Sequence, residues 1–184
     1  ERQQPFFLWL HLFDPHAPYE PPPAFRALYA GRPYDGEIAF VDTQVARLLA
    51  GLDRAGLTNR TLVVLLSDHG ESLGEHGEQT HGVLLYDSTL RVPLIFRLPG
   101  SLPPGTVRRD PATLADVAPT VLALAGLETG PRGDGTDLFA PRSGTAEREL
   151  AAISESPRRR LGWADLTAIR QGPWKYILSP QPAP

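Results

Sequence analysis

All five histidines of the chain lie in its first 81 residues, and one of them directly follows an aspartate. Asp68 and His69 stand together in Ser67-Asp68-His69-Gly70-Glu71, immediately after an apolar stretch. A carboxylate oxygen and an imidazole nitrogen are both ligands for divalent cations, and Gly70 permits a sharp turn behind them. The pattern is compatible with a metal site, but for these two residues alone a turn or a helix cap is the commoner interpretation.

The other histidines carry less information individually. His11 lies inside an apolar run, where a hydrogen-bonded core histidine is the common role, and His16 lies in the loop just beyond that run. His76 lies in a Gly- and Glu-rich loop, where we expect solvent exposure. His81 is the last histidine in the chain. Because ligands bind beyond the carboxyl ends of the strands in an open α/β sheet, histidines after two such strands could converge on one crevice.

Ser72 offers a different chemistry. Residues 70–74 match G-x-S-x-G, the nucleophile elbow of α/β-hydrolases, and they follow a predicted strand. The triad of that family needs a histidine well downstream of the serine, and only His76 and His81 follow, both too close. We therefore regard the esterase interpretation as the weaker one.

The elements that must position these residues follow from hydrophobic periodicity. Apolar runs predict strands buried on both faces at residues 6–12 and further strands at 61–66 and 92–97. A proline-bent loop is expected up to about residue 33. Apolar residues at three- and four-residue steps predict a helix over 38–52, with Asp35 as a possible cap and Gly56 as its stop. Asp116 is expected to cap a short helix over 117–125.

The order strand, helix, strand predicts an α/β fold with a mostly parallel sheet flanked by helices. The end of the chain differs in composition. A long loop is expected over 130–148, followed by short strands at 149–153, 164–170 and 174–178 that form a small antiparallel subdomain. We accordingly expect one α/β part over 1–129 and a loop with this subdomain over 130–184.

Composition sets limits on the class of protein. The chain has 184 residues, 41% hydrophobic and 21% charged, as expected for a globular domain. A net charge of −3 gives no basic footprint for nucleic acid, and no apolar run is long enough to span a bilayer. The absence of cysteine excludes disulfides and Cys-ligated metals. Methionine is also absent, even at position 1, so we interpret the chain as part of a longer protein.

Several segments, in order, resemble the carboxy-terminal half of a sulfatase, a member of the alkaline phosphatase superfamily. The resemblance covers nearly the whole chain and is most specific in the first and third of the segments. These segments are residues 5–19, Tyr34-Asp35-Gly36-Glu37-Ile38-Ala39, residues 67–77, Leu90-Arg91-Val92-Pro93-Leu94-Ile95, Asp116-Val117-Ala118-Pro119-Thr120 and residues 162–177.

The resemblance implies roles for four residues. Asp68 and His69 would be ligands of one divalent metal ion, His16 would contact the sulfate and protonate the leaving group, and His81 would take the place of a substrate-binding lysine. The only lysine here, Lys175, lies far off in the tail. Many sulfatases hold Ca²⁺ with Asn at the position of His69. The resemblance therefore favours Ca²⁺, while Mn²⁺ and Zn²⁺ stay open because imidazole suits these two ions better.

The resemblance also implies a formylglycine nucleophile, made from Cys or Ser in a C-x-P-S-R motif that these 184 residues lack. We expect the chain by itself to be inactive and the complete protein to hydrolyse a sulfate ester. A phosphoryl-transfer enzyme of the same superfamily is the nearest alternative. A non-catalytic binding module that keeps the fold is the other.

Overall fold

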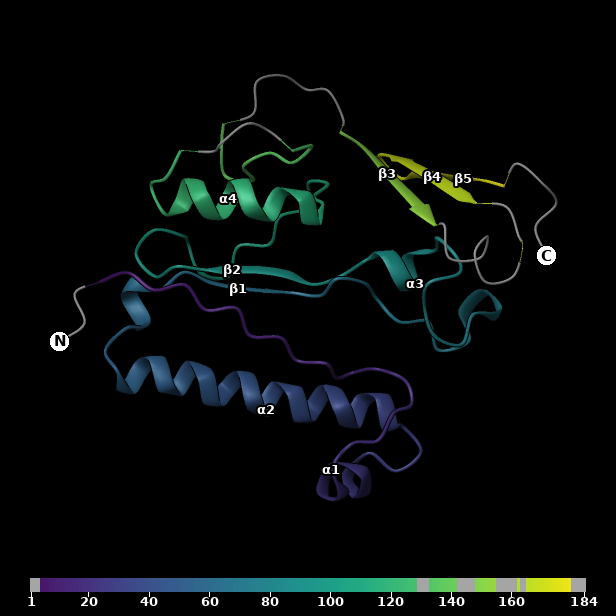
Figure 1. The fold of residues 1–184 in the computed structure, drawn as a ribbon, viewed down its shortest axis with the longest axis horizontal. Coiled ribbons are helices and arrows are strands. Elements are labelled where there is room, and N and C mark those ends of the chain that lie inside the picture. Colours follow the sequence, from purple (N-terminus) through teal and green to yellow (C-terminus); the bar gives the residue numbers. More distant parts are fainter. Residues whose placement is uncertain (1–3, 129–132, 142–147, 155–161, 163–164, 180–184) are drawn as a thin grey trace. The chain divides into compact units, whose positions relative to one another are not determined.

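The computed structural model describes residues 4–128, 133–141, 148–154, 162 and 165–179 (Figure 1). The chain divides into two compact units, Glu1–Thr61 and Leu62–Pro184. These units divide after Thr61, whereas the sequence suggests a boundary near residue 130. The boundary near residue 130 stays a prediction. No helix among the described residues is long and apolar enough to cross a membrane.

The first unit is built on α2, a 22-residue helix over Pro33–Arg54, which confirms the helix predicted there. Pro33 occupies its first turn, where a missing N–H costs nothing, and Gly56 follows its end with φ of 64°. Asp35 lies inside the first turn instead of capping it and pairs with Arg32 at 3.1 Å. The 3₁₀ turn η1, Thr58–Arg60, follows.

Two expectations for the beginning of the chain are wrong. The loop expected up to residue 33 contains the short helix α1, Pro23–Leu28, which begins at a proline of the Pro18–Pro23 cluster. Residues 6–12 form no strand and are mostly exposed; the side chains of Phe7 and Trp9 are 82% and 74% exposed. The physical reason is that a buried strand needs hydrogen-bonding neighbours, and within the described part of the chain no strand pairs with this run.

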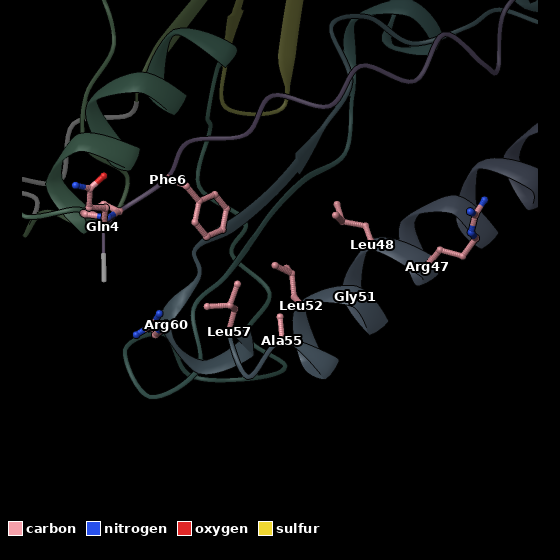
Figure 2. Close-up of a pocket in the computed structure, with 10 residues that line it drawn as sticks. Gln4, Phe6, Arg47, Leu48, Gly51, Leu52, Ala55, Leu57 and Arg60 are labelled. Atoms are coloured by element: carbon pink, nitrogen blue, oxygen red, sulfur yellow. The ribbon is translucent and has the colours of Figure 1, made fainter. Parts of the chain in front are cut away.

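Residues of this run and of α2 border an apolar hollow inside the first unit (Figure 2). Phe6, Leu48, Leu52 and Leu57 contribute apolar side chains to it. The described residues that line the hollow include no histidine and no carboxylate. It therefore holds none of the groups that the sequence singled out for chemistry.

The second unit contains β1, Val63–Leu66, and β2, Leu94–Arg97, which confirms both predicted strands. They pair antiparallel, with Leu66 opposite Leu94, so the expected parallel arrangement is not found among the described residues. The reason is the connection: a parallel pair needs a crossover to the far end of the sheet, whereas here the chain returns beside the end it left. That connection, over residues 67–93, includes the 3₁₀ turn η2, Glu75–Gly77, and the helix α3, Asp87–Leu90.

The antiparallel subdomain predicted for the tail is confirmed. Its strands β3, β4 and β5 lie in that order, with all pairs antiparallel, at Glu149–Ser154, Leu166–Gln171 and Trp174–Leu178. Leu166 and Ala168 of β4 form a buried cluster with Leu85, from the connection between β1 and β2. The sheet thus supports the segment that carries the candidate site. Much of the loop expected over 130–148 lies outside the described residues.

Asp116 stands at the N-cap position of the helix that follows it, as the sequence predicts, but its side chain makes no capping hydrogen bond to that helix. It ends the 3₁₀ turn η3, Leu114–Asp116, just before α4, Val117–Leu124, and forms a capping box with Thr113. Its fully buried carboxylate also accepts hydrogen bonds from Thr136 N and both terminal nitrogens of Arg148, at 2.6–2.8 Å. Burial raises the pKa of Asp116, but the bonds from Arg148, Thr136 and Thr113 outweigh it and lower the pKa to about 2. The Asp116 carboxylate therefore joins the segments that carry Thr113, Thr136 and Arg148.

Candidate functional site

Asp68 and His69 follow β1 and have a geometry that fits two ligands of one cation. Asp68 Oδ1 lies 3.7 Å from His69 Nε2, and the Asp68 side chain is 81% exposed. The distance from His69 Nδ1 to the Gly70 carbonyl oxygen is 2.8 Å. Since that oxygen can only accept, Nδ1 is the nitrogen that carries a hydrogen in this contact, which leaves Nε2 as the nitrogen that could face a metal, as in many metal-bound histidines. Ligand atoms about 2.0–2.6 Å from one ion span a separation of this size.

Gly70 is needed for a reason other than the turn that the sequence suggests. Its φ is not in the left-handed region, but a Cβ at this position would lie 2.2 Å from the carbonyl oxygen of Ser88. The Gly70 amide also donates to the Thr89 carbonyl at 2.8 Å. The backbone of α3 therefore lies directly against the Asp68 and His69 segment and fixes its position.

His81 lies beside this pair. Its ring stacks on that of His69, with centroids 3.9 Å apart and an interplanar angle of 28°. His81 Nδ1 donates to Glu71 Oε1 at 3.0 Å, and the Glu71 side chain is only 5% exposed. The buried Glu78 accepts bonds from the amides of Val83 and Leu84, which hold the chain just after His81. The structure thus brings Asp68, His69 and His81 together.

His16 belongs to the other compact unit, so its place in the same site stays a prediction. Its backbone N–H donates to Glu37 Oε2 at 3.1 Å, and its Nδ1 lies 2.6 Å from the Ala17 carbonyl oxygen. Its ring packs against Phe13 at 4.3 Å. Within the described residues no group of three or more His, Cys, Asp or Glu is placed to hold a metal, so Asp68 and His69 supply two ligands at most.

The remaining sequence candidates lie outside this cluster. His11 is exposed, which corrects the expectation of a core histidine, because the run around it is itself uncovered. His76 is exposed as predicted, and its ring stacks on Tyr86 at 3.7 Å. Ser72 is fully buried, and its hydroxyl donates to the Glu75 carbonyl at 3.0 Å. A nucleophile must reach substrate, so the geometry excludes the elbow interpretation.

Sequence reasoning missed the glutamates that shape the loops around His16 and His81. Glu37, Glu71 and Glu78 all have largely buried side chains whose carboxylates accept hydrogen bonds from those loops. Two of them stand inside the quoted motifs, at Tyr34-Asp35-Gly36-Glu37 and Ser67-Asp68-His69-Gly70-Glu71. The place of Glu37 and Glu71 inside these motifs was the signal visible in the sequence, whereas the burial and the hydrogen-bond partners of the three glutamates depend on how the loops are placed.

Comparison with known proteins decides the family. The family model described as Sulfatase matches residues 1–127. This chain belongs to the sulfatase family. It is 38% identical over 161 residues to the steryl-sulfatase of Mus musculus, covering 80% of the chain and 26% of that protein. The choline-sulfatase of Rhizobium meliloti is 35% identical over 149 residues, covering 79% of the chain and 28% of that protein.

Comparison with solved structures supports the fold expected for this family. The crystal structure of Ps i-CgsB superposes with a TM-score of 0.76 at 26% identity, covering 95% of the chain and 41% of that protein. These matches support the alkaline phosphatase-like fold of the sulfatases, whereas the parallel sheet predicted for it is not seen in the described part of this chain. The chain spans about a quarter of the length of the curated relatives named above.

Proposed function

We propose that this chain forms part of a metal-dependent sulfatase that hydrolyses sulfate esters. The observation that carries the proposal is the Asp68 and His69 pair, whose Oδ1 and Nε2 lie 3.7 Å apart at the start of a loop held by α3. Membership of the sulfatase family supports the same reaction. A divalent ion held there would supply a Lewis acid for the sulfuryl oxygens.

The residues of this chain would then bind the ester and move one proton. Glu71 occupies the Nδ1 side of His81, so any contact between His81 and the sulfate is made through Nε2. His16 would donate a proton from Nε2 to the departing alkoxide oxygen, since its Nδ1 faces the Ala17 carbonyl. The nucleophile would be a formylglycine outside these 184 residues.

A phosphoryl-group enzyme of the same superfamily is the second candidate, and one observation favours it. His69 presents an imidazole at the proposed metal site, which suits Mn²⁺ or Zn²⁺ better than the Ca²⁺ held by sulfatases with Asn there. A tetrahedral phosphate ester would occupy the same site as a sulfate ester. The identity of the bound metal therefore bears on whether the enzyme transfers a sulfuryl or a phosphoryl group.

The test uses the complete protein and turnover of nitrophenyl sulfate. We expect activity that a chelator abolishes and a divalent ion restores, and we expect Asp68→Ala to lose bound metal and activity together. Asp134→Ala, a change at an exposed aspartate, is the matched control and keeps both. Stoichiometric metal in the Asp68 variant would show that Asp68 is a turn residue and would contradict the proposal.

A further inference from the structure

The loop that carries His16 is fastened to helix α2 by one buried carboxylate. Glu37 Oε2 accepts the His16 N–H at 3.1 Å, and Glu37 Oε1 accepts the Glu20 N–H at 2.6 Å. Glu37 is only 2% exposed, so both bonds form away from water. The two amides stand on either side of the Pro18 turn, and both oxygens of the carboxylate are therefore used on the one loop that holds His16.

The neighbouring residue allows this contact. Gly36 lies close to the buried Pro21, and a Cβ added to Gly36 would come within 3.0 Å of the Pro21 ring. A side chain at position 36 would require the Pro21 ring to shift by a few tenths of an ångström. Gly36 therefore permits the loop to lie close to α2. The Glu37 carboxylate then accepts hydrogen bonds from the two backbone N–H groups that lie near it.

We propose that Glu37 is the positioning residue of His16. This inference rests on the proposed function, in which His16 protonates the leaving group. A general acid must hold its ring nitrogen within hydrogen-bond reach of the ester oxygen. Glu37 fixes the backbone at His16, and the contact of Nδ1 with the Ala17 carbonyl fixes the ring, so that Nε2 points in one direction.

The chemistry requires a carboxylate at this position. Two N–H donors need two acceptors, and a glutamine offers only one, with its NH₂ facing the second donor. Glu37→Gln keeps the size of the side chain and loses one anchor, whichever way the amide turns. Asp42→Asn is the matched control, because it removes the same charge from an exposed position on the same helix.

The experiment is a double-mutant cycle in the complete enzyme, with an alkyl sulfate and nitrophenyl sulfate as substrates. We expect Glu37→Gln to lower kcat/KM for the alkyl sulfate by about tenfold or more and to lower that for nitrophenyl sulfate much less, because a basic leaving group needs the acid most. In the His16→Ala background, Glu37→Gln should cost less than about twofold. A loss that is equal for both substrates, or equal in both backgrounds, would show a merely structural role and overturn the inference.

A second measurement separates this inference from the proposed function. Hydrogen–deuterium exchange of the peptide 14–20 in the complete protein includes the His16 and Glu20 amides among its few exchangeable N–H groups, since Pro15 and Pro18 have none. Glu37→Gln should speed the exchange of at least one of these two amides by about tenfold or more relative to wild type and Asp42→Asn. Unchanged exchange would overturn the inference. Absence of sulfate turnover in an enzyme whose exchange responds as expected would count against the proposed function alone, and the cycle would then be run with the matching phosphate esters.

Discussion

Replacing Asp116 by asparagine tests whether one carboxylate joins three segments of the second unit. Asparagine keeps the shape of the side chain but removes the charge and turns an NH₂ toward donors. The contacts at stake are the paired bonds to Arg148 at 2.6 and 2.8 Å and the backbone bonds from Thr113 and Thr136 at 2.7 and 2.8 Å. We expect this variant of the complete protein to fold but to unfold more easily than wild type.

The magnitude follows from burial. Removing one partner of a buried ion pair costs about 3–5 kcal/mol. The Asp116 side chain is fully buried but Arg148 is 22% exposed, so water can solvate part of the stranded guanidinium. We therefore expect a loss of about 2–3 kcal/mol in the free energy of unfolding, which lowers Tm by a few degrees, because the entropy of unfolding of a long protein is large. Asp134→Asn, at an exposed position, is the control and should change Tm little.

The contribution of the Asp116 charge to stability depends on pH in a known direction. The pKa of Asp116 is lowered from 3.8 to about 2, so its contribution to stability is present above about pH 4 and is lost as the pH falls toward 2. Denaturant unfolding measures the free energy of unfolding of wild type and Asp116→Asn at several pH values. The difference between the two proteins should shrink by about 2 kcal/mol as the pH falls toward 2. A difference that is below about 0.5 kcal/mol at pH 7, or that stays constant down to pH 2, would refute the reasoning.

The remaining predictions concern the candidate site. Gly70→Ala places a methyl group 2.2 Å from the Ser88 oxygen, so it should cost about 2 kcal/mol or more of stability, measured by thermal melting, and lower the metal content. A normal melting curve would contradict this contact. Ser72→Ala removes a buried hydroxyl and should cost about 1 kcal/mol while turnover stays near wild type; a hundredfold loss of turnover would restore the nucleophile interpretation. His16→Ala should slow hydrolysis of an alkyl sulfate by about 10²–10⁴-fold and that of nitrophenyl sulfate far less; equal losses would leave His16 as a sulfate-binding residue.

Elements with a strong local signal were predictable from sequence. The helix α2 carries apolar residues at helical steps with Pro33 at its start and Gly56 after its end, and each signal acts within a few residues. The hairpin of β4 and β5 turns at Gly172 and Pro173, and Gly172 adopts the positive φ of 54° that a glycine permits. Such features depend on neighbouring residues alone.

Pairing and burial were not predictable, because they depend on distant partners. The run over residues 6–12 has the composition of a buried strand, yet strand formation requires a neighbour that composition cannot supply. Likewise, β1 and β2 were found from their apolar content, but nothing in that content distinguishes an antiparallel return from a parallel crossover. Asp116 has the sequence context of a cap, while its main partner, Arg148, stands 32 residues away.

For the candidate site too, local features could be predicted from the sequence and long-range contacts could not. Asp68 and His69 are adjacent in sequence, so their common position after a strand could be predicted, and His81 followed from the family resemblance. The role of Glu37 could not be seen, because it meets a backbone donor 21 residues away and a hydrophobicity pattern carries no information about such donors. A buried glutamate beside each candidate histidine emerges only once the loops are placed.

The most direct test of the account is the ratio of kcat/KM for nitrophenyl sulfate to that for nitrophenyl phosphate, measured on the complete, metal-loaded protein. A sulfatase that uses Asp68 and His69 should favour the sulfate ester by at least about tenfold, or roughly 1.4 kcal/mol in transition-state binding. The preference should disappear together with activity in Asp68→Ala and persist in Asp134→Ala. A preference for the phosphate ester, or sulfate turnover that survives loss of the metal, would contradict it.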